Sequence, residues 1–250
     1  LLKNDTGIGT IFVEASGANY GSVPMPDGFL QGIRDLADEL DKVLIFDEVI
    51  TGFRWSPGGR QALDGVTPDI TTLAKVVTGG LPGGAICGRR DIMDLLDPGK
   101  PRDGLAPPVS HKGTFNAAPL VAAGAIAAMK LLFTGDVQRQ ADAMAARLRD
   151  GLNACFARRS MAAVAYGDSS TCHLYFGGKS IEGLSAAQIR NVPPELVNSL
   201  RSGLLAGGVD FMSFTSCVTS CAHTPDLIDE ALGIFDDVLG KMTVDGVISS

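Results

Sequence analysis

The sequence lacks the features that mark membrane proteins, secreted proteins and nucleic-acid-binding proteins. No apolar run approaches the roughly 18 residues of a membrane-spanning helix. The first residues also lack the charged and then apolar segments of a secretory signal. The net charge is −7, and no cluster of Lys and Arg is present to contact a phosphate backbone. We therefore expect a cytoplasmic protein with no membrane and no nucleic-acid partner.

Cysteine is scarce, and the cysteines are scattered. Five of them occur in 250 residues. An odd number spread over a chain of this length argues against a disulfide framework. No C-x-x-C pair with a matching Cys or His pair is present to build a zinc site. We therefore expect the cysteines to be small core or near-core residues and the protein to hold no metal.

A phosphate-binding P-loop is also missing from the expected place. An apolar strand followed by Asp47-Glu48 is typical of the magnesium-binding strand of nucleotide hydrolases, which makes an ATPase the leading rival interpretation. That class needs G-x-x-x-x-G-K-[ST] ahead of the strand. The one G-K-S here, Gly178-Lys179-Ser180, comes after it, and His173 occupies the place of the first glycine. The sequence therefore disfavours an ATPase.

The chain is organised around two short stretches with an ordinary globular composition around them, 45% hydrophobic and 20% charged. The apolar run before Asp47 is typical of a strand buried on both faces of a parallel sheet. A second run, Thr71-Thr72-Leu73-Ala74, ends at Lys75. Open α/β sheets bind ligands at the carboxyl ends of their strands, so we expect Asp47 and Lys75 to face one crevice. A carboxylate and an amine placed in this way suggest imine chemistry.

The order of the remaining elements predicts an α/β fold. Hydrophobic spacing and turn residues predict a strand over 9–14, a helix over 29–40 and a strand over 43–47, which together form a right-handed βαβ unit. Later strands are expected at 70–75, 85–88, 171–176 and 209–214, and later helices at 91–96, 117–133, 137–158 and 225–239. We therefore expect a mostly parallel sheet within residues 1–134, followed by a small α+β domain over 135–250.

Several motifs occur together in one order. They are Asp47-Glu48-Val49-Ile50-Thr51-Gly52-Phe53-Arg54, Thr67-Pro68-Asp69, Lys75 followed by Gly79-Gly80-Leu81-Pro82-Gly83-Gly84, and Gly113-Thr114-Phe115-Asn116. As a set they resemble the class III pyridoxal-phosphate-dependent aminotransferases of fold type I, and most of all the glutamate-1-semialdehyde aminomutase group. The resemblance runs from about Phe12 to Leu239.

The resemblance implies pyridoxal 5'-phosphate as cofactor and a role for particular residues. Lys75 matches the lysine that forms the internal aldimine and then shuttles a proton. Asp47 matches the aspartate that keeps the pyridine nitrogen protonated, which makes the ring an electron sink. Val49, expected on the same strand face as Asp47, matches the residue that packs against the ring.

Two further matches concern the cofactor's other groups. Thr114 matches the threonine that binds the cofactor phosphate of a neighbouring subunit, which implies a homodimer with shared active sites; a helix-entry cap is the alternative. Asn19, five residues beyond Glu14, matches the asparagine that contacts the phenolic oxygen. His111 either reaches the site or is an ordinary loop histidine, and Glu48 and Arg54 are expected to hold local structure.

The chain departs from the family pattern in three places. It begins after the family's phosphate-gripping loop and stacking aromatic residue, so we expect the N-terminal part of the large domain to be missing. Glu14 is followed by Ala15 where the family has Pro, and residues 209–223 contain no glutamate or arginine. We therefore expect amino transfer between an amine or amino acid and a carbonyl compound. The alternatives are 2,1-aminomutase activity, or an inactive fragment that serves as a dimerisation or binding module.

Overall fold

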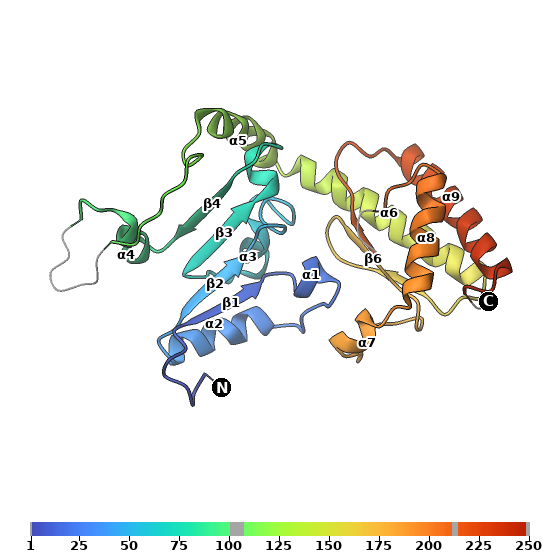
Figure 1. The fold of residues 1–250 in the computed structure, drawn as a ribbon, viewed down its shortest axis with the longest axis horizontal. Coiled ribbons are helices and arrows are strands. Elements are labelled where there is room, and N and C mark those ends of the chain that lie inside the picture. Colours follow the sequence, from blue (N-terminus) through green and yellow to red (C-terminus); the bar gives the residue numbers. More distant parts are fainter. Residues whose placement is uncertain (1, 101–107, 212–214, 249–250) are drawn as a thin grey trace. The chain divides into compact units, whose positions relative to one another are not determined.

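The protein folds as two compact units in a computed structural model (Figure 1). The structure describes residues 2–100, 108–211 and 215–248. The first unit consists of Leu1–Ser16 and Met25–Gly135, and the second of Gly17–Pro24 and Asp136–Ser250. The short segment after β1 thus packs with the C-terminal part of the chain and not with its neighbours in sequence.

The first unit is built on a four-stranded sheet in the order β1-β2-β3-β4. Its strands are β1 (Thr10–Glu14), β2 (Val43–Asp47), β3 (Ile70–Ala74) and β4 (Gly84–Gly88). The first three strands are parallel, and β4 runs antiparallel to β3. Helix α2 (Phe29–Glu39) connects β1 to β2 and packs on the sheet (Figure 1). The predicted strand-helix-strand unit and the mostly parallel sheet are confirmed.

Helix α2 covers one face of this sheet. Leu44 and Phe46 are fully buried under it together with Leu30 and Ala37, whereas Ile45, between the two, is only half-buried. The side chains of a strand alternate between its faces, so the other face is the less covered one. The prediction that β2 is buried on both faces is therefore wrong for the part of the chain that the structure describes.

The rest of the first unit follows β2 and β3. Its further elements are α3 (Gly59–Asp64), the 3₁₀ turn η1 (Lys75–Thr78), α4 (Arg90–Met93), the 3₁₀ turn η2 (Asp94–Leu96) and α5 (Pro119–Leu132). Turn η1 packs closely on α5, because a Cβ atom on Gly79 would lie 2.8 Å from the carbonyl oxygen of Gly124. Gly79 also has φ +64°, which favours glycine. One of the glycines that follow Lys75 thus serves helix packing.

The second unit has helices packed around a three-stranded antiparallel sheet in the order β5-β6-β7. Its elements are α1 (Ala18–Gly21), α6 (Asp136–Arg158), β5 (Val164–Tyr166), β6 (Thr171–Tyr175), α7 (Ala186–Arg190), α8 (Pro194–Ala206), β7 (Ser216–Val218) and α9 (Pro225–Val244). Helix α6 packs on both α9 and β5, and α8 packs on α9 (Figure 1). The core contains Leu152, Phe156, Leu200 and Phe235, each at most 2% exposed.

One predicted strand of this unit is wrong. Residues 209–211 are not in a strand, and residues 212–214 lie outside the described part of the chain. The strand that pairs with β6 is β7, which begins at Ser216. No strand or helix was predicted at the positions of β5, α7 and α8. Among the described residues no single helix is long and apolar enough to cross a membrane, and only α5 and α6 taken together reach such a length and composition.

Candidate active site

The carboxyl ends of β2 and β3 bring Asp47 and Lys75 to the same edge of the sheet. The two strands are parallel neighbours, and Asp47 is aligned with Thr72. Lys75 follows directly after the last residue of β3. Asp47 and Lys75 therefore lie at the same edge of the sheet, and their facing one crevice stays a prediction.

One oxygen of the Asp47 carboxylate accepts a hydrogen bond, and the other is open to a further donor. Its Oδ1 accepts a hydrogen bond of 2.9 Å from the backbone N–H of Val49. The main chain of Asp47 is held as well, because its carbonyl accepts a 3.3 Å bond from the Ala15 N–H. Within the described part of the chain, Oδ2 has no hydrogen-bond partner. A half-buried carboxylate on a fixed backbone can thus bind a further proton donor.

Lys75 is exposed and has an unusual backbone conformation. Its φ is +53°, in the left-handed region that non-glycine residues rarely adopt. The Thr78 hydroxyl donates to the Lys75 carbonyl at 3.1 Å and to the Leu81 carbonyl at 2.5 Å, which closes turn η1. The ammonium group forms no hydrogen bond or ion pair with any described residue. Strain at a residue that carries an unpaired nucleophile is typical of a functional position.

Glu48, the neighbour of Asp47, is fully engaged in structure. Its side chain is completely buried. One oxygen accepts from the Thr51 hydroxyl at 2.7 Å and the Arg60 N–H at 2.8 Å, and the other accepts from the Gln61 N–H at 3.0 Å and Nε2 at 3.1 Å. These contacts tie the end of β2 to the first turn of α3. Glu48 thus holds local structure, as expected.

Val49 does not have the local structure that was expected of it, and Thr114 does not fit the alternative that it caps a helix. Val49 lies in a turn after the end of β2, so it does not share a strand face with Asp47. The Val49 N–H instead donates a hydrogen bond to the Asp47 carboxylate. Thr114 is not a helix cap, because α5 begins at Pro119 with Ala118 as its cap residue. Thr114 and His111 are both exposed on the segment that precedes α5.

Asn19 belongs to the second unit, whereas the four other predicted site residues belong to the first. It lies in α1 with φ +54° and ψ +58°, and the next residue, Tyr20, has φ +46°. Asparagine tolerates this left-handed region better than most residues, which fits it to the tight turn here. The ring of Tyr20 packs against His173 of β6, with the centroids 5.2 Å apart.

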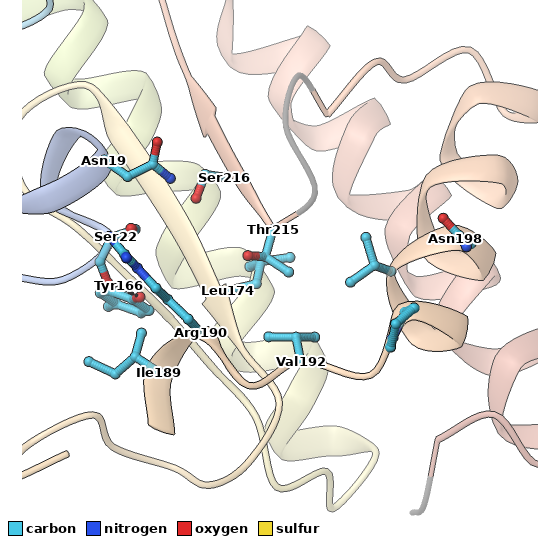
Figure 2. A pocket seen from close by; sticks show the side chains of 12 residues that line it. Asn19, Ser22, Tyr166, Leu174, Ile189, Arg190, Val192, Asn198, Thr215 and Ser216 are labelled. Carbon is cyan, nitrogen blue, oxygen red and sulfur yellow. Dashed lines mark hydrogen bonds between the residues drawn. The ribbon is translucent and has the colours of Figure 1, made fainter. Parts of the chain in front are cut away.

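The second unit contains a pocket that the sequence did not reveal (Figure 2). Its volume is about 590 Å³. The lining residues are Asn19, Ser22, Tyr166, Leu174, Ile189, Arg190, Val192, Pro194, Val197, Asn198, Thr215 and Ser216. They come from α1, three strands, α7 and α8, so no single stretch of sequence carries a signal for the pocket.

A buried histidine lies behind this pocket. His173 is 1% exposed, and its Nδ1 lies 2.7 Å from the hydroxyl of Ser216, a lining residue. Its ring also packs against Tyr166, with the centroids 5.4 Å apart. Burial lowers the pKa of His173 to about 4, so the imidazole is neutral near pH 7. The Tyr166 hydroxyl donates to the Ser22 carbonyl at 2.6 Å, and burial raises its pKa to about 12.

The donor set at the sheet edge suits an aldehyde-bearing aromatic cofactor. An unpaired primary amine can bond to a carbonyl carbon, and a carboxylate with an open oxygen can hold a protonated ring nitrogen. Lys75 and Asp47 therefore fit pyridoxal phosphate. No three His, Cys, Asp or Glu side chains gather as metal ligands in the described residues.

Comparison with known proteins identifies the family. The aminotransferase class-III family profile matches residues 2–167. Glutamate-1-semialdehyde 2,1-aminomutase of Caldivirga maquilingensis is 33% identical over 239 residues, which are 94% of this chain and 53% of that protein. The chain thus spans about half the length of the curated relatives that it matches.

Two solved structures have the same fold. One is a β-phenylalanine aminotransferase from Variovorax paradoxus, with a TM-score of 0.80 and 29% identity over 95% of this chain and 53% of that one. The other is an omega-transaminase from Sphaerobacter thermophilus, with a TM-score of 0.80 and 26% identity over 92% of this chain and 51% of that one. The predicted fold type I architecture is confirmed. With residues 2–167 matching the family profile, this chain belongs to the class-III aminotransferase family.

Proposed function

We propose that the protein transfers an amino group between an amine or amino acid and a carbonyl compound, with pyridoxal 5'-phosphate held by Lys75 and Asp47. The observation that carries this proposal is that an unpaired amine and a carboxylate lie at the same edge of the sheet. The family uses pyridoxal phosphate and acts on amino and carbonyl substrates. When bound, the cofactor supplies an aldehyde for the amino group and an aromatic system that accepts electrons.

Lys75 and Asp47 have separate tasks in this proposal. Lys75 would hold the cofactor through its amine and would serve as the base that moves a proton at the substrate's Cα. Asp47 would hold the ring nitrogen through its open oxygen and would so keep that nitrogen protonated. By the family resemblance, Val49 would pack against the ring and Asn19 would contact the phenolic oxygen.

We further propose a homodimer in which Thr114 binds the cofactor phosphate of the other subunit. The Thr114 hydroxyl has no partner in the described part of the chain and is exposed. Large apolar side chains are also exposed close by in sequence, at Phe115, Leu120, Ile126, Leu131 and Phe133. Apolar exposure along one helix and the turn before it is typical of a protein interface. The five free thiols fit a reducing compartment such as the cytoplasm.

The reaction could also be a 2,1-aminomutation, in which the amino group moves within one substrate. The likeness to aminomutases at 33% identity favours this second candidate. Against it, residues 209–223 contain no glutamate. We therefore rank amino transfer between two molecules first. An inactive dimerisation or binding module is the third candidate, because the chain spans about half of its relatives' length.

An assay with three substrates separates these candidates. The chain is supplied with pyridoxal phosphate and either an arylalkylamine with a 2-oxo acid or glutamate 1-semialdehyde alone, and the products are measured by mass spectrometry. We expect the ketone from the amine and a new amino acid from the oxo acid, and no product from the Lys75→Ala variant. Product from the semialdehyde alone would favour the aminomutase. Cofactor bound at Lys75 without any product would favour the binding module.

A further inference from the structure

The pocket of the second unit has a polar end, an apolar middle and a second polar position. In Figure 2 the Arg190 side chain points towards Ser22 and Tyr166, and the Asn19 side chain projects on the same side of the pocket. Asn198 lies at the opposite end. Leu174, Val192 and Thr215 lie between the two ends. A ligand that fills the pocket would therefore contact a charged group at one end and mostly apolar side chains in the middle.

Arg190 is the charged group of this pocket, and it lacks a counter-ion. It is exposed and makes no ion pair or side-chain hydrogen bond with any residue that the structure describes. No Asp or Glu is among the described residues that line the pocket. Four other arginines of this unit, Arg147 and Arg159 among them, are paired with aspartates. A guanidinium that points into a cavity without an acid favours an anionic ligand, and its planar fork matches a carboxylate.

Two other lining groups are open for a ligand. The side chains of Asn198 and Thr215 form no hydrogen bond with the described residues. Leu174, Ile189, Val192, Pro194 and Val197 supply the apolar part of the lining. A volume of about 590 Å³ lies in the range of small-molecule sites, roughly 300 to 1,000 Å³.

The wall that faces Arg190 is held in place before any ligand binds. Ser216 is buried, and its hydroxyl is hydrogen-bonded to the neutral ring of His173. That ring packs against Tyr166. Tyr166 in turn donates its hydroxyl to Ser22. A fixed polar wall lowers the ordering cost of binding, because its side chains do not have to be immobilised by the ligand.

We propose that this pocket binds a small carboxylic acid with an apolar body, and that Arg190 binds the carboxylate. Residues 209–223 contain no arginine that could bind a carboxylate. The fold supplies one from α7, whose Arg190 lines the same pocket as Thr215. The lining residues all belong to the second unit, so the proposal does not require Lys75.

Isothermal titration calorimetry of the full chain without pyridoxal phosphate tests the proposal. The probe is 3-phenylpropionate, and the matched neutral probe is 3-phenylpropanamide. We expect the acid to bind at least tenfold more tightly than the amide. Arg190→Gln should weaken acid binding about ten- to hundredfold, the usual effect of losing a hydrogen-bonded charge, and leave amide binding unchanged. Arg201→Gln, an exposed arginine of α8 outside the pocket, should change neither.

Two results would overturn the proposal. One is that the unaltered chain binds the acid and the amide equally well, or that Arg190→Gln and Arg201→Gln lose the same affinity for the acid. The other is binding of inorganic phosphate through Arg190 with no binding of the acid, which would make the site a phosphate site. If Arg190→Gln proves unfolded by circular dichroism, Arg190→Lys serves instead; it keeps the charge but lacks the fork, so acid binding should still weaken severalfold.

Discussion

Asp47 is half-buried, fixed by its backbone and open at one carboxylate oxygen. In the proposed function Asp47 keeps the pyridine nitrogen protonated. Glu48 cannot replace it, because the Glu48 carboxylate already accepts hydrogen bonds from Thr51 and from α3. Asp47→Ala should therefore reduce turnover by about 10³-fold or more, while Lys75 still binds the cofactor. Steady-state rates with saturating cofactor measure this.

The matched control for that prediction is Asp35→Ala. Asp35 is an exposed aspartate on α2, away from the carboxyl ends of the strands. Its replacement should leave turnover unchanged. Equal turnover in the Asp47 variant and the unaltered chain would refute the role of Asp47.

His173 gives the stability of the protein a dependence on pH. Burial lowers its folded-state pKa to about 4, whereas an unfolded histidine titrates near 6.5. The unfolded chain therefore binds a proton first as the pH falls. Stability that is complete above pH 6.5 should decrease by about 3 kcal/mol as the pH falls to 4. Urea unfolding measures this. Between pH 7 and pH 4.5, the free energy of unfolding should fall less for His173→Gln than for the unaltered chain.

His223→Gln is the control, because it removes an exposed histidine. This variant should lose as much stability on acidification as the unaltered chain. If His173→Gln shows the same loss as well, the acid sensitivity does not come from the buried imidazole.

Helix α3 depends on a carboxylate from a different element. Glu48, after the end of β2, accepts the N–H groups of Arg60 and Gln61 in the first turn of α3. Without it these donors and the Thr51 hydroxyl would lose a buried, charged partner. Glu48→Ala should lower the free energy of unfolding by about 3 kcal/mol or more. Glu39→Ala, at an exposed ion pair with Lys3, should change it by less than about 1 kcal/mol.

Equal unfolding free energies in these two variants would contradict the account of α3. The midpoint of urea unfolding measures both. Loss of α3 would also loosen the connection between β2 and β3, so cofactor binding should weaken together with stability in Glu48→Ala.

The elements that the sequence predicted best carry strong local signals. Strand β2 has a run of apolar residues that ends in an acid, and α9 has helical spacing with Thr224 as a side-chain cap. Strand β7 was missed because its buried residues, Ser216 and Cys217, are small and partly polar. The pairing of β7 with β6 is set by tertiary contact, which no local pattern records.

The candidate site divides in the same way. Asp47 and Lys75 could be predicted because parallel strands place their carboxyl ends at one sheet edge. The conformation of Val49 could not, because the chain turns after Asp47 and no longer alternates between the faces of the sheet. The pocket around Arg190 could not be predicted either, because its lining comes from six separate elements and the connections between them.

The molecule as a whole exposes an apolar surface on α5. Leu120, Ile126 and Leu131 are 71%, 58% and 64% exposed. If this surface forms the proposed homodimer, a lysine at Ile126 would bury an unpaired charge in the interface. Ile126→Lys should raise the dimer dissociation constant at least tenfold, measured by analytical ultracentrifugation.

Val244→Lys provides the control for the dimer. Val244 on α9 is 88% exposed, and a charge there should leave the association state unchanged. A chain that is monomeric at high micromolar concentration, or equally dimeric in both variants, would contradict an interface on α5.

The most direct test of the account is covalent capture of the cofactor. The chain is incubated with pyridoxal phosphate, reduced with borohydride, digested and analysed by mass spectrometry. We predict one phosphopyridoxyl group per chain, attached to Lys75, and its loss in Lys75→Arg but not in Lys42→Arg. Capture at other lysines with none at Lys75, or no capture at all, would contradict the account.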